Sequence, residues 1–404
     1  MKKILSNEQL MMLGKVSLME IRLLEEDYLN YLTAWSDSSK GEILVLAGLG
    51  ARGSDGIVFE TESAEEMPEY LAKLIQEYDI RIPIQYRGQR GIVGEKFEIE
   101  TMIEDLLLSE NIFYEQNLKS IVLNSPFFFQ EYEKLLKFSK NKNKEYLFQV
   151  DTFKIENVEI PSLEKLLLKT KPEKIIASQS MGFLLSLLYS KKLYEKRTTT
   201  FDEKNKIKLY GSVPVAELYQ AGKDAAANFL KILEPFYVLF GAVPSASNGF
   251  AKFLDFLKIS DLTHGFLKTF IEQYKTSSFI LEGNMGAITK EVNNYRIEKV
   301  IPENLNSFIG EINLIYSLND SVSSINQIKK IIGRLEEISF EGKIKLIQSN
   351  ISHSQGLPYL LEKMPSLLAG FFEKHENHTH HVTKFGKITY EQYIPFGEEL
   401  EPLS

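Results

Sequence analysis

The sequence predicts an α/β fold, built as a mostly parallel, doubly wound sheet into which a helical cap is inserted. Short apolar runs, of the kind found in strands buried on both faces, alternate along the chain with stretches of helical periodicity. This alternation is typical of a parallel sheet whose two faces are covered by helices. Glycine-rich or polar residues follow several of the apolar runs, at the edge of the sheet where such folds bind ligands.

The expected elements follow one another in a regular order. Residues 16–35 read as two short strands or a hairpin, broken near the acidic residues 25–27. Apolar runs predict further strands at residues 42–47, 80–86, 174–179, 206–215, 312–316 and 344–347. Helical spacing predicts helices at residues 64–78, 95–109, 181–188, 324–338 and 357–372. The stretch 112–165 is less regular, with strands expected at 120–123 and 146–150.

The chain divides into a core and an insertion. Residues 1–215 and 301–404 form the expected α/β core, and residues 216–300, which are mainly helical in pattern, form the expected cap. Phenylalanines are dense between residues 229 and 270. They are most simply the core of the cap itself, and an apolar site for an acyl group is the sharper alternative.

Composition argues against several classes of function. With 44% hydrophobic and 25% charged residues, the 404-residue chain is an ordinary globular protein. A net charge of −8 with dispersed Lys and Arg argues against nucleic acid as the main partner. The absence of Cys excludes thiolate nucleophiles, disulfides and Cys-ligated metals, and it fits a cytoplasmic location. No uncharged run of about 18 residues occurs, so no transmembrane segment is expected. Polar residues 6–9 interrupt the start of what would otherwise be a signal peptide.

The most informative motif is a sharp turn with a serine at its tip. Residues 174–185 read as an apolar strand, a turn at Ser180, and a helix without charge in its first turns. A turn tight enough to lift a serine hydroxyl above a sheet strains the backbone and needs small neighbours. Gly182 meets this need, while Ser178 stands where the usual G-x-S-x-G pattern has its first glycine. The pattern predicts a nucleophilic serine, and a buried strand followed by a core helix is the simpler alternative.

A serine nucleophile needs a base, and the base needs a group that orients it. Of the six histidines, only His353 follows a late predicted strand. Asp320 follows the strand before it and is the best candidate carboxylate, with Glu217 in reserve. Ser180, Asp320 and His353 should therefore share one edge of the sheet. The simpler alternatives are an aspartate that caps a turn and a histidine on a surface loop.

The ordered set of motifs resembles the α/β-hydrolase superfamily. Five segments that span nearly the whole chain carry the resemblance: residues 46–50, 86–88, 178–182, 318–322 and 352–353. The resemblance implies Ser180 as nucleophile, His353 as base and Asp320 as the group that orients it. It also implies an oxyanion hole from the backbone N–H groups of Met181 and Leu49. The layout loosely resembles an uncharacterised bacterial family of hydrolase-like proteins, which supplies no activity.

The remaining candidate residues concern substrate and metal. Gly48 and Gly50 flank Leu49, and Arg87 near the predicted pocket is suited to bind a carboxylate or phosphate. A salt-bridged structural arginine is an equal alternative. The histidines between residues 375 and 381 lack the spacing of a helical metal site. Adventitious surface binding is therefore expected there, and neither a metal site nor a cofactor is predicted.

The sequence thus predicts a serine-dependent acyl hydrolase, similar to esterases and thioesterases, with a small-molecule or acyl substrate. An acyltransferase that uses the same triad is one alternative. A non-catalytic binding protein on the same fold is the other, because a fold does not fix a function. The sequence gives no oligomeric state.

Overall fold

The computed structural model of the protein describes about half of the chain. The described residues are 16–23, 28–34, 36, 39–48, 69–83, 86–87, 97–115, 154–158, 173–196, 206–218, 291, 294–318, 320, 322–370 and 378–398. Most of the predicted cap, residues 219–290, lies outside them, so the division into core and cap stays a prediction. The strands expected at 120–123 and 146–150 also lie outside the described residues.

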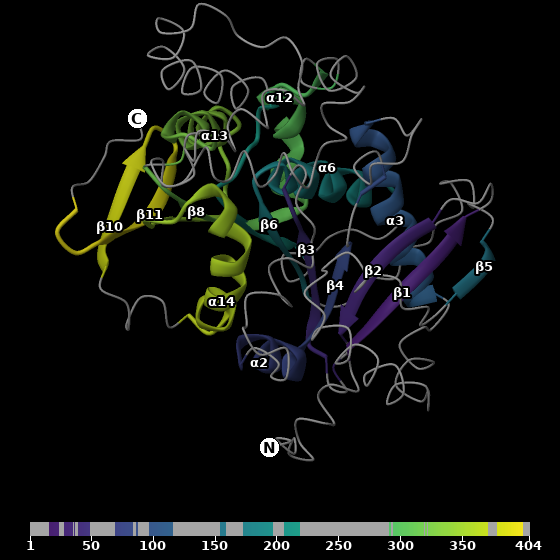
Figure 1. The fold of residues 1–404 in the computed structure, drawn as a ribbon. Coiled ribbons are helices and arrows are strands. Elements are labelled where there is room, and N and C mark those ends of the chain that lie inside the picture. Colours follow the sequence, from purple (N-terminus) through teal and green to yellow (C-terminus); the bar gives the residue numbers. More distant parts are fainter. Residues whose placement is uncertain are drawn as a thin grey trace, which may run out of the picture.

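The described strands form one sheet of eleven, which Figure 1 shows from the side. Their bounds are β1 Val16–Leu23, β2 Tyr28–Ala34, β3 Gly41–Leu46, β4 Tyr78–Pro83, β5 Lys154–Val158, β6 Glu173–Gln179, β7 Ile207–Ser212, β8 Ile309–Tyr316, β9 Lys343–Gln348, β10 His378–Phe385 and β11 Ile388–Pro395. The spatial order is β10-β11-β9-β8-β7-β6-β3-β4-β2-β1-β5.

The sheet is mostly parallel, as the sequence predicts. Every pairing from β4 through β3, β6, β7, β8 and β9 to β11 is parallel. The antiparallel pairings are β1 with β2, β2 with β4, and β10 with β11. The central strands are buried on both faces, so they show as apolar runs in the sequence; all six residues of β3 are buried.

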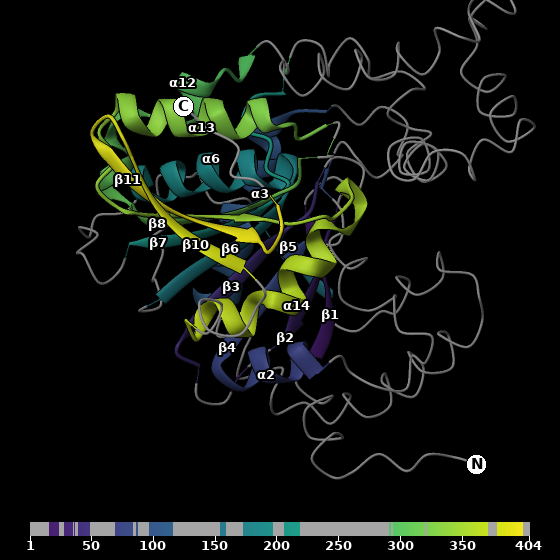
Figure 2. The ribbon, with the colours of Figure 1, turned by 90° about the vertical axis from the view of Figure 1, so that its left-hand side faces the viewer.

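Helices cover both faces of the sheet, as Figure 2 shows. One face carries α3 (Ile99–Glu115), α6 (Met181–Lys196), α12 (Ile297–Val300) and α13 (Ile325–Glu337), whose apolar residues share one core. The other face carries α2 (Glu69–Glu77) and α14 (Gly356–Leu368), which share a second core. The doubly wound arrangement is therefore confirmed. Among the helices of the described ranges, none is long and apolar enough to cross a membrane.

Three strands are not predicted from the sequence: β5, β10 and β11. β10 and β5 lie at the two edges of the sheet, and both are rich in polar residues. An edge strand needs little apolar surface, and charged or polar side chains there discourage pairing with other chains. Residues 378–385 are accordingly a strand, although their histidines were assessed above by the spacing of a helical metal site.

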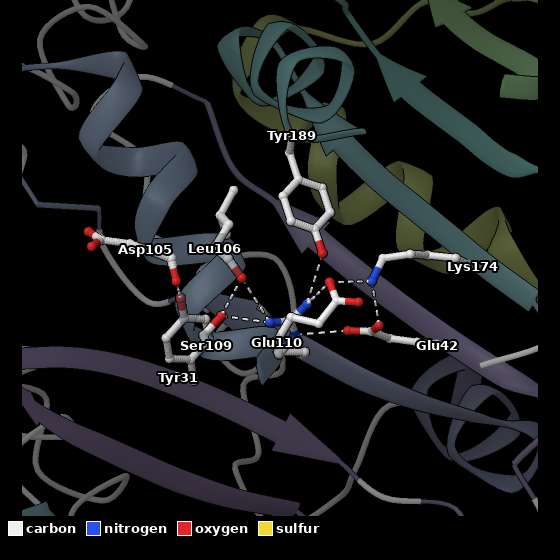
Figure 3. A network of polar contacts seen from close by, with 9 residues as sticks. Tyr31, Glu42, Asp105, Leu106, Ser109, Glu110, Lys174 and Tyr189 are labelled. Atoms are coloured by element: carbon white, nitrogen blue, oxygen red, sulfur yellow. Dashed lines mark hydrogen bonds and ion pairs between the residues drawn. The ribbon is translucent and has the colours of Figure 1, made fainter. Parts of the chain in front are cut away.

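Four buried charged groups join strands β3, β4 and β6 to α3 (Figure 3). Glu42 of β3 accepts from Arg81 of β4 at 2.8 Å and from Lys174 of β6 at 2.9 Å. Glu110 of α3 accepts from the same two cations, at 3.4 Å from Arg81 and 2.6 Å from Lys174. The four side chains are at most 4% exposed. Two positive and two negative charges therefore neutralise one another inside the protein.

Burial alone raises the pKa of the Glu42 carboxyl, because a charge is poorly solvated inside a protein. The adjacent charges and hydrogen bonds of Arg81 and Lys174 outweigh this, and the pKa lies well below its usual range. The carboxylate is thus held ionised, as the neutrality of the cluster requires.

Candidate active site

Ser180 forms the tip of a tight turn between β6 and α6. Its φ of 52° lies in the left-handed region, which residues other than glycine seldom adopt. Three backbone hydrogen bonds fix this strained conformation. The Ser180 N–H donates to Ser212 O at 3.1 Å, and Ser180 O accepts from the N–H groups of Phe183 and Val215 at 3.0 and 3.1 Å. The turn is therefore determined by its surroundings, as strained functional turns are.

Small residues allow the strands and helix to meet at this turn. A Cβ atom on Gly182 would lie 2.3 Å from Leu46 O, so any side chain there would collide with β3. A Cβ on Gly48 would lie 3.0 Å from the Cβ of Ser180 and 3.5 Å from its hydroxyl. Ser178, the departure from the usual glycine, is accommodated because its hydroxyl donates to Tyr210 O of β7 at 3.2 Å.

A serine raised on a strand-to-helix turn above a mostly parallel sheet is the arrangement found in α/β hydrolases. The chain has an α/β-hydrolase-like fold. In the parallel order β6-β7-β8-β9, β8 lies next to β7 and β9 next to β8, so the carboxyl ends of β8 and β9 lie at the same end of the sheet as that of β6. Residues that follow β8 and β9 can therefore reach the serine.

Gly182→Ala is expected to lower the free energy of unfolding by about 1–3 kcal/mol or more, because the methyl group would meet backbone oxygens that cannot turn aside. Gly333→Ala is the matched control: it lies within α13, and a Cβ there meets nothing within 4 Å. That variant should gain up to about 1 kcal/mol from better helix propensity. Urea unfolding of the two variants measures both effects, and a Gly182→Ala protein as stable as wild type would contradict the close approach.

The structure brings Ser180, His353 and Asp320 together. His353 begins η7 (His353–Gln355), a short 3₁₀ turn after β9, and Asp320 follows β8. The Nε2 atom of His353 lies 2.9 Å from Ser180 Oγ, and its Nδ1 atom lies 2.8 Å from Asp320 Oδ2. The imidazole thus stands between hydroxyl and carboxylate. Ser180 is 6% exposed, and the His353 and Asp320 side chains are 10% and 0% exposed.

The carboxylate of Asp320 is held on both of its oxygens. Oδ1 accepts from the N–H groups of Val322 and Ser323 at 2.8 and 2.7 Å, which leaves Oδ2 for the imidazole. An ionised carboxylate can only accept, so the neutral ring carries its proton on Nδ1 and presents a bare Nε2 to the serine hydroxyl. This is the tautomer in which a histidine can take the proton of a serine.

Burial raises the pKa of the Asp320 carboxyl. The charge of His353, the hydrogen bond from its ring and the hydrogen bonds from two backbone N–H groups lower this pKa by more than burial raises it. The net effect is a pKa below the ordinary value. The ionised group therefore adds stability above the pKa of an unfolded Asp, about 4, and this stability is lost as the pH falls through the folded-state pKa.

Asp320→Asn is accordingly expected to flatten the acid limb of the stability profile. Urea unfolding between about pH 6 and about pH 3 should show a smaller loss of unfolding free energy in Asp320→Asn than in the wild type. The variant has no carboxyl to protonate at this position. Parallel profiles for the two proteins would contradict the lowered pKa.

Of the two predicted oxyanion donors, Met181 lies among the residues that the structure describes and Leu49 does not. Met181 is the first residue of α6, where the N–H groups of a helix lack partners within the helix and attract negative charge. Its N–H belongs to the residue directly after Ser180, the predicted nucleophile. Leu49 and Gly50 lie outside the described residues, so their predicted roles stay predictions.

Arg87 and Glu217 are each engaged with other partners. Arg87 donates to Asp105 through two nitrogens, one of them at 2.8 Å, which is the salt-bridged arrangement that the sequence left open. Its role in substrate binding stays a prediction. Glu217, the reserve acid, pairs with Arg296 and Lys330. It is Asp320 that contacts His353.

The histidine-rich segment lies on the edge strand β10. The ring of His380 stacks on Tyr393 and lies 3.5 Å from the Glu391 carboxylate, while His378 Nε2 donates to Gln348 O at 3.3 Å. Successive side chains of a strand point to opposite faces, so the adjacent His380 and His381 are directed apart. Within the described ranges, no group of three or more His, Cys, Asp or Glu residues is placed to hold a metal ion.

The sequence analysis does not single out Gln179, which also reaches the site. Its Nε2 donates to the main-chain oxygen of His353 at 2.5 Å. Its place directly before the nucleophile is the only signal that the sequence offers. Its partner is a main-chain oxygen 174 positions away, which carries no residue-type signal in the sequence.

Comparison with known proteins gives similarity at low identity. No protein-family model and no curated protein matches the chain. A hydrolase from Pseudomonas aeruginosa PA01 is 11% identical, with a TM-score of 0.42 over 88% of this chain and 99% of its own. An esterase from Pyrococcus furiosus is 11% identical, with a TM-score of 0.43 over 92% and 96% of the chains. The mouse α/β hydrolase domain-containing protein 10 is 13% identical, with a TM-score of 0.41 over 88% and 99%. Similarity at this level assigns no activity to the chain.

Proposed function

We propose that this protein is a serine-dependent acyl hydrolase, similar to esterases or thioesterases, in which Ser180, His353 and Asp320 act together. A single observation carries the proposal: the His353 ring lies within hydrogen-bond distance of both the serine hydroxyl and the aspartate carboxylate. A nucleophile, a base within reach of it, and a group that orients the base are the parts that acyl transfer requires.

The reaction begins with transfer of the Ser180 proton to His353 Nε2 as Oγ attacks the acyl carbonyl. The carbonyl π electrons move to oxygen, giving a tetrahedral intermediate. The imidazolium then gives its proton to the leaving alcohol or thiol as the bond from carbon to that group breaks. Water, deprotonated by the same nitrogen, then attacks the acyl-serine carbonyl and forms a second tetrahedral intermediate. As this intermediate collapses, the bond from carbon to Oγ breaks, the imidazolium returns its proton to Oγ, and the acid leaves. Asp320 keeps the ring in the required tautomer and stabilises its positive charge.

Negative charge on the intermediate's oxygen requires N–H donors in place before the reaction starts. The N–H of Met181 at the start of α6 is one proposed donor, and Leu49 is the other. Gly48, which precedes Leu49 in the chain, approaches Ser180 closely: a Cβ there would lie 3.5 Å from the hydroxyl. Every proposed proton and electron transfer uses side chains, backbone groups or water.

A fluorophosphonate probe tests the proposal, because an activated serine displaces its fluoride and becomes phosphonylated on Oγ. The wild type should be labelled, and Ser180→Ala should not. Ser186→Ala is the matched control: Ser186 is buried in α6 and donates to Phe183 O, so its removal should leave labelling unchanged. A folded wild type that does not react would favour the non-catalytic binding protein.

The acceptor is decided by product analysis. Wild-type protein that has not been treated with the probe should convert an ester to free acid if water is the acceptor. A new ester that forms only when an alcohol is supplied would instead identify the acyltransferase.

A further inference from the structure

The triad contacts fix the His353 ring but not the peptide that carries it. His353 lies on a three-residue 3₁₀ turn whose start is closed by reciprocal bonds between Ser352 and Gln355. These bonds are internal to the turn. Another contact must set the position of this 3₁₀ turn relative to the turn at Ser180. The distance from His353 Nε2 to Ser180 Oγ depends on the positions of both turns.

Gln179 links the 3₁₀ turn of His353 to the turn at Ser180. It is the last residue of β6, directly before Ser180, and it is 4% exposed. Its side chain spans to η7, where Nε2 donates to the main-chain oxygen of His353 at 2.5 Å. The residue beside the nucleophile therefore holds the backbone of the residue that supplies the base.

A close contact at Gly356, just after the 3₁₀ turn of His353, packs the start of α14 against the residues beside Ser180. A Cβ on Gly356 would lie 2.7 Å from Val213 Cγ2 and 3.2 Å from Gln179 Cγ. The first residue of α14 thus packs directly on the ends of β6 and β7. Val213 has a φ of 42°, a region that a β-branched residue rarely enters. The neighbouring structure holds this edge in a strained conformation, so the edge has little freedom to shift.

We propose that Gln179 is a positioning residue for acyl transfer: its amide sets the distance and angle between the His353 imidazole and the Ser180 hydroxyl. The inference rests on the proposed function, because only a reaction between these groups makes their geometry matter. A catalytic group displaced by about 1 Å can lose about 10²-fold in rate. The amide is engaged with the main-chain oxygen of His353, and the proposal gives it no contact with a substrate or probe, so affinity should be spared.

The first test separates the reaction rate from binding. Gln179→Met keeps the length and burial of the side chain but removes the N–H donor. Its maximal rate of inactivation by a fluorophosphonate should fall about 10- to 100-fold. The probe concentration that gives half of this rate should change less than about twofold, as it should if binding is spared. Gln179→His restores a ring N–H at a similar reach and should recover most of the rate.

Two further variants control for folding. Gln392→Met removes another buried glutamine, whose amide donates to Tyr316 Oη at 2.8 Å, and should lower stability without changing the maximal rate. Gln179→Asn keeps the amide but is one methylene too short to reach the His353 oxygen. A fully reactive Gln179→Asn would overturn the positioning role even if Gln179→Met did not fold.

A second measurement does not require activity. Proton NMR of the His353 Nδ1–H reports its bond to Asp320 as a downfield resonance that exchanges slowly. The signal should be strong in the wild type, weak or absent in Gln179→Met, and present in Gln179→His. Retention of both rate and signal in Gln179→Met would overturn the positioning role and leave acyl transfer standing. A wild type that is inert to the probe would refute acyl transfer, and a signal that still depends on Gln179 would then show only that this amide holds the His353 peptide in place.

Discussion

Asp320→Asn is expected to lower the rate constant for fluorophosphonate labelling about 10⁴-fold while leaving the fold intact. The asparagine oxygen can still accept from the N–H groups of Val322 and Ser323, so the turn should persist. Its NH₂ group, however, would face His353 Nδ1 and favour the ring with its proton on Nε2. That tautomer cannot accept the proton of Ser180. Stopped-time labelling and circular dichroism measure the two parts of the prediction.

Glu217→Gln is the control for this experiment. Glu217 is buried and ion-paired like a functional carboxylate, but its partners are Arg296 and Lys330. The Glu217→Gln variant should keep the labelling rate of the wild type. Wild-type labelling in Asp320→Asn together with an inactive Glu217→Gln would show that the wrong carboxylate had been assigned.

Lys174→Met should lower the free energy of unfolding by about 3–5 kcal/mol, the second large effect expected here. Lys174 is the cation shared by Glu42 and Glu110, and its removal leaves two buried carboxylates with Arg81 alone. In the wild type, two cations offset the free-energy cost of removing the two carboxylates from water. In the variant, only Arg81 offsets this cost. Urea unfolding at neutral pH measures the loss.

The matched control for the buried cluster is Lys40→Met. Lys40 forms an ion pair with Glu77 at a similar distance of 2.9 Å, but both side chains are more than half exposed. Water and salt screen such a pair, so its loss should cost less than about 1 kcal/mol. Equal losses in Lys174→Met and Lys40→Met would mean that the buried cluster stabilises no more than a surface contact.

The fold was predictable wherever burial dictates the sequence. Strands covered on both faces must be apolar, and β3, β6 and β8 therefore stand out as apolar runs. The order of Ser180, Asp320 and His353, each after such a strand, predicts from the sequence alone that they share one edge of the sheet. Gly182 likewise followed from the need for a close approach.

The rest depends on partners that are distant in the sequence. β5 and β10 pair at the sheet edges through backbone atoms, so their polar side chains carry little signal. Nothing in the sequence next to Arg87 indicates that its guanidinium forms a salt bridge with Asp105. The same is true of Gln179, whose partner is a backbone oxygen with no side-chain identity to read.

The proposed triad is assembled from segments far apart in the chain, with Ser180 and His353 separated by 173 positions and Asp320 and His353 by 33. Parallel pairing between distant segments folds slowly, because chain closure costs entropy before contacts repay it. The hydroxyl gains its base only when β6, β7, β8 and β9 have all found their neighbours. A covalent label on Ser180 therefore counts molecules that have completed renaturation, whereas helical signals also count those that have not.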